Sequence, residues 1–435
     1  MRMYDIIYKK RMAEPLSRQE IDFVIDGFVN GSIPDYQMSA LAMAICFNGM
    51  SKEETFYLTD AMMRSGDVVN LDRFEGLCVD KHSTGGVGDK TTLVIAPIVA
   101  SLGVKVAKMS GRGLGFTGGT IDKLESIKGF KTELDGEDFF SQVEKIGVSV
   151  IGQSGNLVPA DKKLYALRDV TATVDSIPLI ASSIMSKKLA SGAHSIVLDV
   201  KCGSGAFMKE EKTAIALAKA MIEIGQSFSR NVCALITNMD KPLGVAIGNS
   251  LEVYEAIQIL SCKGDDELLE LCVELSSNMT SMALQISVEK ARDMVLDAIK
   301  SGKALAKLEE WIVAQGGENE AIKNPEILLK AEYKKEYKAK KTGYICKMNA
   351  EQMGISSMLL GAGRRTKEDK IDHLAGIMLN KKLGDFVNEG DTIATLYTST
   401  ECLLKDAEKS LDFAIEYSSE MPIKSPLIIK VLKAD

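Results

Sequence analysis

The chain has 435 residues, and its 46% hydrophobic and 26% charged fractions are those of an ordinary folded protein, which excludes a mainly disordered chain. The net charge of −7 argues against binding to a nucleic-acid backbone, although a local basic pocket for a small anion remains compatible with it. No apolar run approaches the ~20 residues that span a bilayer, and the N-terminus lacks a signal-peptide core, so we expect a cytoplasmic protein without membrane contact.

The segment 1–65 has a helical pattern throughout. Ser17 with Glu20, and Ser51 with Glu54, have the spacing of capping boxes that begin helices. From residue 77 onward, long helical stretches alternate with short apolar runs, at 77–79, 104–107, 148–151, 196–200 and 232–236. This alternation predicts a mostly parallel sheet with crossover helices.

Two later segments break this alternation. The segment 159–191 predicts two helices without a strand between them, and we expect these helices to leave the sheet and pack on the N-terminal helices. After residue 341 the chain has short strands with glycines, typical of a small barrel-sandwich module. The predicted fold class is therefore α/β, with a small all-helical domain, a large α/β domain with a mostly parallel sheet, and a C-terminal α+β barrel-sandwich-like module. The expected boundaries are 1–70 with 159–192, 71–158 with 193–330, and 331–435.

A first glycine-rich loop, DKHSTGGVGDKTT at 80–92, follows a predicted strand and opens a predicted helix. Glycines let backbone N–H groups approach an anion at the positive end of a helix. Lys81, Ser83 and Thr92 add an ammonium and two hydroxyl donors. Asp89 stands where a P-loop requires glycine, which argues against an ATPase. An ordinary tight turn between a strand and a helix is the alternative.

A second glycine-rich loop, KMSGRGLGFTGGT at 108–120, has the same position between a strand and a helix. It contains the G-x-G-x-x-G pattern of dinucleotide sites, but the pattern is short and glycine is dense here. Lys108, Ser110 and Thr120 are side chains suited to a free oxyanion. Ligands bind at the carboxyl ends of parallel strands, so the two loops predict one shared anion pocket.

A third candidate lies on the two helices that are expected to leave the sheet. Arg168 and Lys187 would present two cations, and Ser183 a hydroxyl, to a polar planar ligand. A solvated basic helix face is the alternative, and the pattern alone favours it. The eight cysteines are scattered without a Cys-x-x-Cys pair and predict reduced packing thiols. Of three histidines, His194 and His373 are expected to be surface or packing residues.

Three segments together resemble the thymidine and pyrimidine-nucleoside phosphorylases. SGRGLGFTGGTIDKLE at 110–125 resembles the family signature, and 81–89 and 165–188 resemble its two other site segments. The resemblance covers nearly the whole chain. It implies a homodimer that catalyses reversible phosphorolysis of uridine, deoxyuridine and thymidine by inorganic phosphate, without an organic cofactor. The products would be the free base and the α-(deoxy)ribose 1-phosphate.

The resemblance also implies roles for individual residues. Phosphate would be held by Lys81, Ser83, Thr92, Lys108, Ser110 and Thr120. The pyrimidine would be held by Arg168, Ser183 and Lys187, with His82 beside it, and the two cations and the histidine would stabilise charge on the departing base. A potassium ion would be held by the backbone at Gly88, residue 90, Leu243 and Ala246, and by the carboxylate of Glu255.

Three positions refine these implications. Phe116 stands where the family usually has a histidine that helps to latch a closed state. Lys90 stands where nearer relatives usually have threonine, so we expect its ammonium to repel or replace the potassium ion. Lys108 stands where thymidine-selective relatives usually have methionine. An ammonium donates hydrogen bonds to a phosphate oxygen and to a 2′-hydroxyl, so we expect uridine to be accepted.

Several alternatives remain open at this point. A thymidine-selective phosphorylase is the nearest one. A phosphoribosyltransferase of the same fold would need a magnesium-bound diphosphate, whose acidic ligands are not found in the expected motif. A nicotinamide-dependent oxidoreductase would explain G-x-G-x-x-G but not Lys81, Arg168 or Lys187. A binding protein without activity is the remaining alternative, since Phe116 and Lys90 depart from the family pattern.

Overall fold

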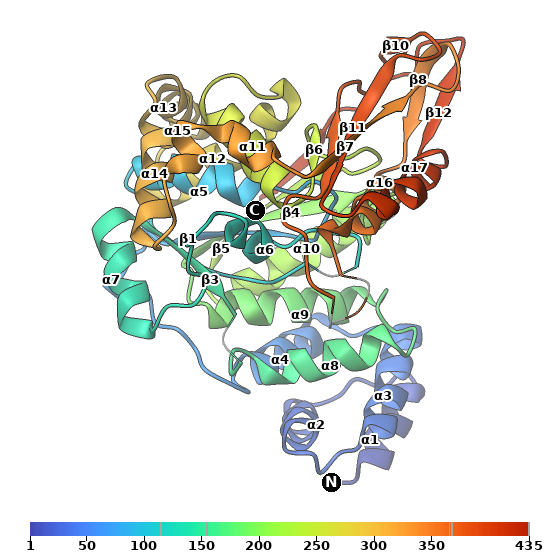
Figure 1. Ribbon diagram of the computed structural model, residues 1–435. Coiled ribbons are helices and arrows are strands. Elements are labelled where there is room, and N and C mark those ends of the chain that lie inside the picture. The colour runs from blue at the N-terminus through green and yellow to red at the C-terminus, as the bar shows by residue number, and fades with distance from the viewer. Residues whose placement is uncertain (114, 154, 365, 367–368, 434–435) are drawn as a thin grey trace.

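The computed structural model describes residues 1–113, 115–153, 155–364, 366 and 369–433. Figure 1 shows helices at the N-terminal end, a sheet with helices in the middle, and a β-rich module that extends away from the sheet. This arrangement confirms the predicted fold class. No helix among these residues is long and apolar enough to cross a bilayer.

The all-helical part begins with four helices, and both predicted capping boxes, at Ser17 and Ser51, are present. The helices are α1 (Met3–Arg11), α2 (Arg18–Asn30), α3 (Asp35–Asn48) and α4 (Lys52–Met63). Two helices from later in the chain, α8 (Pro159–Asp169) and α9 (Ile177–Ala190), supply Leu164 and Leu179 to the same apolar cluster. The two helices thus lie against the N-terminal helices (Figure 1) and bring residues 159–190 to face the sheet.

The central sheet has the strand order β1-β4-β5-β13. Strands β1 (Val79–Ser83), β4 (Ser195–Cys202) and β5 (Asn231–Asn238) are parallel. A second parallel pair, β2 (Val106–Ser110) and β3 (Val148–Gly152), continues beside β1 through a bridge between Cys78 and Lys105. The carboxyl ends of β1 and β2 therefore lie side by side, and both glycine-rich loops begin there.

Most of the remaining helices cover this sheet. They are α5 (Thr91–Ser101), α6 (Thr120–Glu125), α7 (Gly136–Ile146), α10 (Glu211–Ser227), α11 (Asn249–Leu260), α12 (Asp266–Leu284), α13 (Val288–Lys300), α14 (Lys303–Ala314) and α15 (Glu320–Lys323). Helix α5 is buried on all sides from Thr91 to Ala100, because α12, α14 and the strands surround it. Its N-terminus, which carries the first glycine-rich loop, is therefore held rigidly.

The C-terminal module is built from antiparallel strands and two short helices. One sheet has the order β6-β9-β11-β7 and the other β10-β8-β12. The elements are β6 (Ala246–Ile247), β7 (Tyr333–Lys338), β8 (Gly343–Met348), α16 (Ala350–Ser357), β9 (Gly376–Leu379), β10 (Phe386–Val387), β11 (Thr392–Thr398), α17 (Leu404–Leu411) and β12 (Ile415–Ser418). Strand β6 comes from the α/β part of the chain and joins the two regions.

The last strand corrects the expected boundary of this module. Strand β13 (Ile428–Lys433) returns to the central sheet and pairs antiparallel with β5. Its residues Ile429 and Leu432 pack on the apolar cluster between the sheet, α9 and α10. Pairing and burial together cover an edge of the sheet that would otherwise expose unpaired backbone groups. The segment 428–433 therefore belongs structurally to the α/β sheet.

Candidate active site

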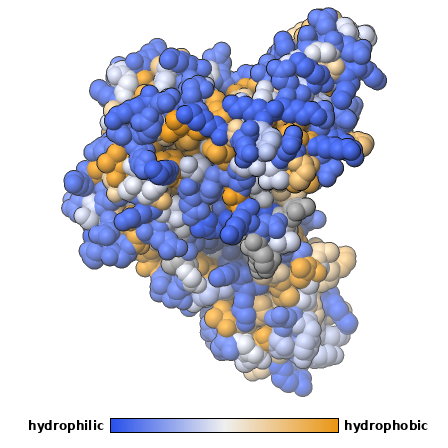
Figure 2. Space-filling model, viewed as in Figure 1, coloured by the Kyte–Doolittle hydropathy of each residue, from blue (hydrophilic) through white to orange (hydrophobic). Residues whose placement is uncertain are grey.

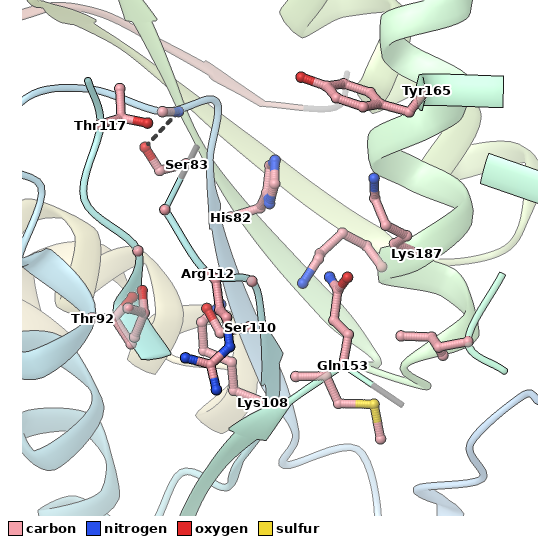
Figure 3. Close-up of a pocket in the computed structure, with 18 of the residues that line it drawn as sticks. His82, Ser83, Thr92, Lys108, Ser110, Arg112, Thr117, Gln153, Tyr165 and Lys187 are labelled. Carbon is pink, nitrogen blue, oxygen red and sulfur yellow. Dashed lines mark hydrogen bonds between the residues drawn. The ribbon is translucent and has the colours of Figure 1, made fainter. Parts of the chain in front are cut away.

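A cavity of about 550 Å³ lies between the α/β domain and the helices α8 and α9. The two glycine-rich loops form one wall, and residues of α8 and α9 form the opposite wall. In Figure 3, His82 stands between Ser83 on one side and Lys187 and Tyr165 on the other. The volume is within the range of small-molecule sites.

All six residues expected to bind phosphate line this one cavity: Lys81, Ser83, Thr92, Lys108, Ser110 and Thr120. They meet because β1 and β2 end together, and because α5 and α6 begin at the far ends of the two loops. Gly85, at φ +100°, adopts a backbone conformation in which a side chain would be strained, and its N–H donates to the Ser83 hydroxyl at 3.2 Å. The structure thus brings together the two loops that the sequence predicted to share a pocket.

A buried carboxylate organises two of the cavity's cations. The Lys108 ammonium donates to Asp80 Oδ1 at 2.9 Å and to the Lys81 carbonyl at 2.6 Å, and the Lys188 ammonium donates to Asp80 Oδ2 at 2.5 Å. Burial and the neighbouring ammonium groups lower the pKa of Lys108 to about 8, although Asp80 opposes this shift. An ammonium has three N–H donors, so Lys108 keeps one for a ligand.

The Lys81 ammonium is held from behind by other acidic groups. Its Nζ lies 3.2 Å from Asp199 Oδ2 and 3.5 Å from Asp89 Oδ2, and it donates to the Thr91 hydroxyl at 2.5 Å. Burial lowers the pKa of Lys81, but the two carboxylates outweigh burial and raise the pKa above its usual value. Lys81 therefore remains charged under ordinary conditions and adds a fixed positive charge to the loop wall.

His82 lies in a strongly positive environment. Burial and the ammonium groups of Lys188, Lys108 and Lys187 lower the pKa of His82 well below its usual value, and Asp80 offsets this only in part. The imidazole is therefore neutral at neutral pH and offers one N–H donor. The expected contact with a departing base is compatible with a hydrogen bond from this neutral ring.

On the wall formed by α8 and α9, Lys187 is positioned by two hydrogen-bond partners. Its ammonium donates to Asp161 Oδ2 at 2.5 Å and to the Ser183 hydroxyl at 3.3 Å, and it lies 6.0 Å from the centroid of the Tyr165 ring. Asp161 and Tyr165 line the cavity but were missed by the sequence reasoning. Their i, i+4 spacing places them on one helix face, but this spacing alone does not mark them as site residues.

Arg168 lies apart from the cavity in this structure, and its expected role at the pyrimidine stays a prediction. Its side chain is 2% exposed and does not line the cavity, and its guanidinium donates to the carbonyls of Thr173, Val174 and Leu179. These carbonyls belong to the turn between α8 and α9 and to the start of α9, which the guanidinium holds together. Ser183 likewise reaches the cavity only through Lys187. Of the three expected pyrimidine contacts, this structure therefore places Lys187 alone in the cavity wall.

Phe116 packs against the C-terminal module. A Cβ built on Gly354 of α16 would lie 2.7 Å from the Phe116 carbonyl oxygen and 3.0 Å from its ring carbon Cδ2. Arg364, also from the module, donates to Asp122 at 3.0 Å, and Asp122 in turn accepts from the Gly113 N–H at 2.5 Å. The second glycine-rich loop is therefore supported by the C-terminal module.

The expected potassium ligands surround the Lys90 side chain. Its ammonium donates to the carbonyls of Leu243 and Ala246, each at 2.8 Å, and to Glu255 Oε2 at 2.6 Å. A Cβ built on Gly88 would lie 3.3 Å from the same Nζ atom. The nitrogen stands where these oxygens would meet a metal ion, so the residues present do not fit potassium. At the site expected from Gly88, Lys90, Leu243, Ala246 and Glu255, the ammonium of Lys90 takes the central position.

Comparison with known proteins agrees with this geometry. Residues 75–305 match the α/β domain of a glycosyl transferase family, residues 4–66 match its helical bundle domain, and residues 344–418 match the pyrimidine nucleoside phosphorylase C-terminal domain. The chain is 56% identical to a pyrimidine-nucleoside phosphorylase of Staphylococcus haemolyticus, over 97% of each chain. It is 54% identical to that of Geobacillus stearothermophilus, over 99% of each.

A solved structure shares the fold. The anthranilate phosphoribosyltransferase of Thermus thermophilus aligns with a TM-score of 0.59 at 17% identity, over 71% of this chain and 98% of the other. The helical bundle and the α/β domain, which match the two domain models of the family, define a glycosyltransferase of this architecture. The C-terminal module and the near full-length identity are more specific, and by them the chain belongs to the pyrimidine-nucleoside phosphorylases.

Proposed function

We propose that this protein catalyses the reversible phosphorolysis of pyrimidine nucleosides to the free base and the α-(deoxy)ribose 1-phosphate. The observation that carries the proposal is the division of one cavity into two walls. Six anion-binding residues lie on the loop wall, and the Lys187 ammonium lies on the helix wall, with His82 between them (Figure 3). Family membership supports the same reaction.

The loop wall is suited to hold the nucleophile. Lys81 and the free N–H of Lys108 supply positive charge, while Ser83, Ser110 and Thr120 supply hydroxyl donors. A phosphate dianion held there is positioned to attack the anomeric carbon of a sugar that lies in the middle of the cavity. Fixing two reactants in this way supplies a large part of the rate enhancement of a bimolecular reaction.

The helix wall is suited to stabilise the negative charge that develops on the departing base. As the glycosidic bond breaks, its electron pair passes to the base, and negative charge develops on the base carbonyl oxygens. The Lys187 ammonium and the N–H of neutral His82 are the donors that face this side, and Asp161 fixes Lys187 in place. One donor aimed at a developing charge is worth roughly 10²–10³ in rate.

The two walls also account for the configuration of the product. Phosphate approaches from the loop wall, while the base leaves toward the helix wall, so attack and departure occur on opposite faces of the sugar. A β-nucleoside is thereby converted to an α-1-phosphate by inversion. Lys108 lies in β2, and its one remaining N–H can be shared between a phosphate oxygen and a 2′-hydroxyl, which supports acceptance of uridine besides deoxyuridine and thymidine.

The direct test is incubation with uridine, deoxyuridine or thymidine, with and without inorganic phosphate, while the release of free base is followed. We expect release that depends strictly on phosphate, and no release from purine nucleosides, because the Lys187 ammonium and the His82 N–H suit the carbonyl oxygens of a pyrimidine base. Release at the same rate without phosphate would identify a hydrolase and contradict the proposal.

We further propose a homodimer. Large apolar side chains are exposed on α1 and α3, which pack side by side: Tyr4 is 67% exposed, Tyr36 73% and Phe47 82%. Figure 2 shows apolar residues at this end of the molecule. A second copy that covers them would bury surface that a monomer leaves in water. Sedimentation in solution tests this assembly.

The eight free cysteines support a cytoplasmic location.

A further inference from the structure

Three oxygen atoms, from the segment 243–246 and from helix α11, surround the Lys90 ammonium, and its side chain is completely buried. The three hydrogen bonds to Leu243, Ala246 and Glu255 use all three N–H donors of the ammonium. Glu255 also accepts from the N–H groups of Val245 and Ala246, each at 2.8 Å. Without Lys90, two carbonyls and a carboxylate would face each other in the interior with a net charge of −1.

Such a cage requires one compact positive charge. An uncompensated carboxylate in the interior is strongly unfavourable. Glycine at 88 leaves space for the cation, because a Cβ there would lie 2.6 Å from the Leu243 carbonyl oxygen. Glycine at 244 is required in the same way, because a Cβ there would lie 2.4 Å from Glu255 Oε1. The backbone is thus shaped around a single monovalent cation.

The cage connects the catalytic loop to the rest of the protein. Lys90 is the residue immediately before α5, between Asp89 and Thr91, and Asp89 and Thr92 both line the cavity. Ala246 begins β6, which pairs with β9 of the C-terminal module, Leu243 lies in the segment just before β6, and Glu255 lies on α11. The cation therefore holds the first glycine-rich loop against the junction of two domains.

We propose that the Lys90 ammonium is a covalently attached replacement for a monovalent metal ion, which holds the first anion loop in its active position and makes the enzyme independent of potassium. An ammonium has the charge of potassium and a similar size, and it satisfies the same oxygens. Because the lysine is part of the chain, its occupancy does not vary with the salt in solution. The rate readout below rests on the proposed phosphorolysis, whereas the stability readout does not.

The test compares the parent with Lys90→Thr in potassium chloride, sodium chloride and choline chloride at equal ionic strength. Both phosphorolysis and the thermal midpoint are measured. We expect the parent to respond equally to all three salts in both readouts. Lys90→Thr vacates the cage, so potassium should raise its thermal midpoint and increase its rate about tenfold or more over choline.

The matched control is Lys123→Thr. Lys123, on α6, is also buried, and its ammonium lies 3.3 Å from the carboxylate of Glu252. Glu252 is on α11, like Glu255, but it is not part of the cage around Lys90. We expect this variant to be destabilised without rescue by potassium. The double variant Lys90→Thr with Glu255→Gln removes the negative charge of the cage, and we expect it to lose the response to potassium.

Three results would overturn the proposal. The first is a parent whose rate or thermal midpoint rises saturably with potassium against choline. The second is a folded Lys90→Thr that keeps the parent's rate and stability in every salt. The third is rescue of Lys123→Thr by potassium to the same extent. If Lys90→Thr does not fold in any salt, the response of the parent's rate and thermal midpoint to potassium decides whether the proposal holds. If no nucleoside is cleaved, the proposed function fails while the thermal midpoint still tests Lys90.

Discussion

The perturbed ammonium of Lys108 leads to a quantitative expectation for the pH dependence of phosphate use. A lysine with a pKa of about 8 is charged below that pH and loses its proton above it. Its one remaining N–H is available to phosphate in the cavity, so we expect binding of phosphate to the free enzyme to require the charged form. Lys81, whose pKa is raised by Asp89 and Asp199 against the effect of burial, stays protonated over the same range.

The size of the effect follows from the pKa. A group of pKa 8 is about 90% protonated at pH 7 and about 9% protonated at pH 9, so kcat/KM calculated on the phosphate dianion should fall about tenfold between these values. Inorganic phosphate remains a dianion in the upper part of this range, and burial raises the pKa of Tyr165. Initial rates at subsaturating phosphate and saturating thymidine, from pH 6.5 to 9.5, measure the profile.

Two variants separate Lys108 from other causes. Lys108→Arg keeps its charge at all these pH values, so its profile should stay flat to pH 9 even if its absolute rate is lower. The pH profile of Lys108→Met should also be flat, and its KM for phosphate should be higher than that of the parent. We expect Lys108→Met to lose about tenfold more activity on uridine than on thymidine, because a buried 2′-hydroxyl would lose the N–H that it shares with phosphate. A parent profile that is flat to pH 9, or an Arg variant that keeps the fall, would refute the assignment.

Two further predictions concern His82 and Gly354. Because His82 is neutral, kcat should show no acidic limb near pH 6.5, and His82→Ala should lower kcat by about one or two orders of magnitude, with partial recovery in His82→Gln, which keeps a neutral donor. A kcat that falls as the pH rises through about 6.5, with this fall absent from His82→Gln, would show proton donation by an imidazolium. Gly354→Ala places a methyl group 2.7 Å from the Phe116 carbonyl oxygen, so the loop must shift at a cost of about 1–3 kcal/mol, and the KM for phosphate should rise severalfold. Gly136→Ala, whose methyl group meets nothing within 4 Å, is the control. An equal KM for phosphate in both variants would show that the C-terminal module does not influence phosphate binding.

The anion-binding half of the cavity could be predicted from the sequence because its parts are local. Each glycine-rich loop follows a short strand and precedes a helix, so its glycines and donors are adjacent in the chain. The only long-range step was the parallel arrangement of β1 and β2, which the alternation of strands and helices predicts. The six residues expected to bind phosphate therefore meet in the structure.

The base-binding half of the cavity depends on side-chain contacts that a local sequence pattern does not predict. Arg168 has the sequence position of a ligand-binding cation, yet the three carbonyls of Thr173, Val174 and Leu179 turn its guanidinium away from the cavity. Asp161 became recognisable only when its carboxylate was placed 2.5 Å from the Lys187 ammonium. A side chain's direction is decided by its competing partners, and these lie on elements that fold together.

By itself, the sequence determined the order of helices and strands, the two anion loops and the chemistry of their donors, because these follow from spacing and residue type within short segments. Only the tertiary structure decided the charge balance of the site. Asp80 meets Lys188 across 108 positions of the chain, and Lys90 meets Glu255 across 165. Buried charges must find opposite charges when water is removed, and which partner each one finds is fixed by packing of distant segments.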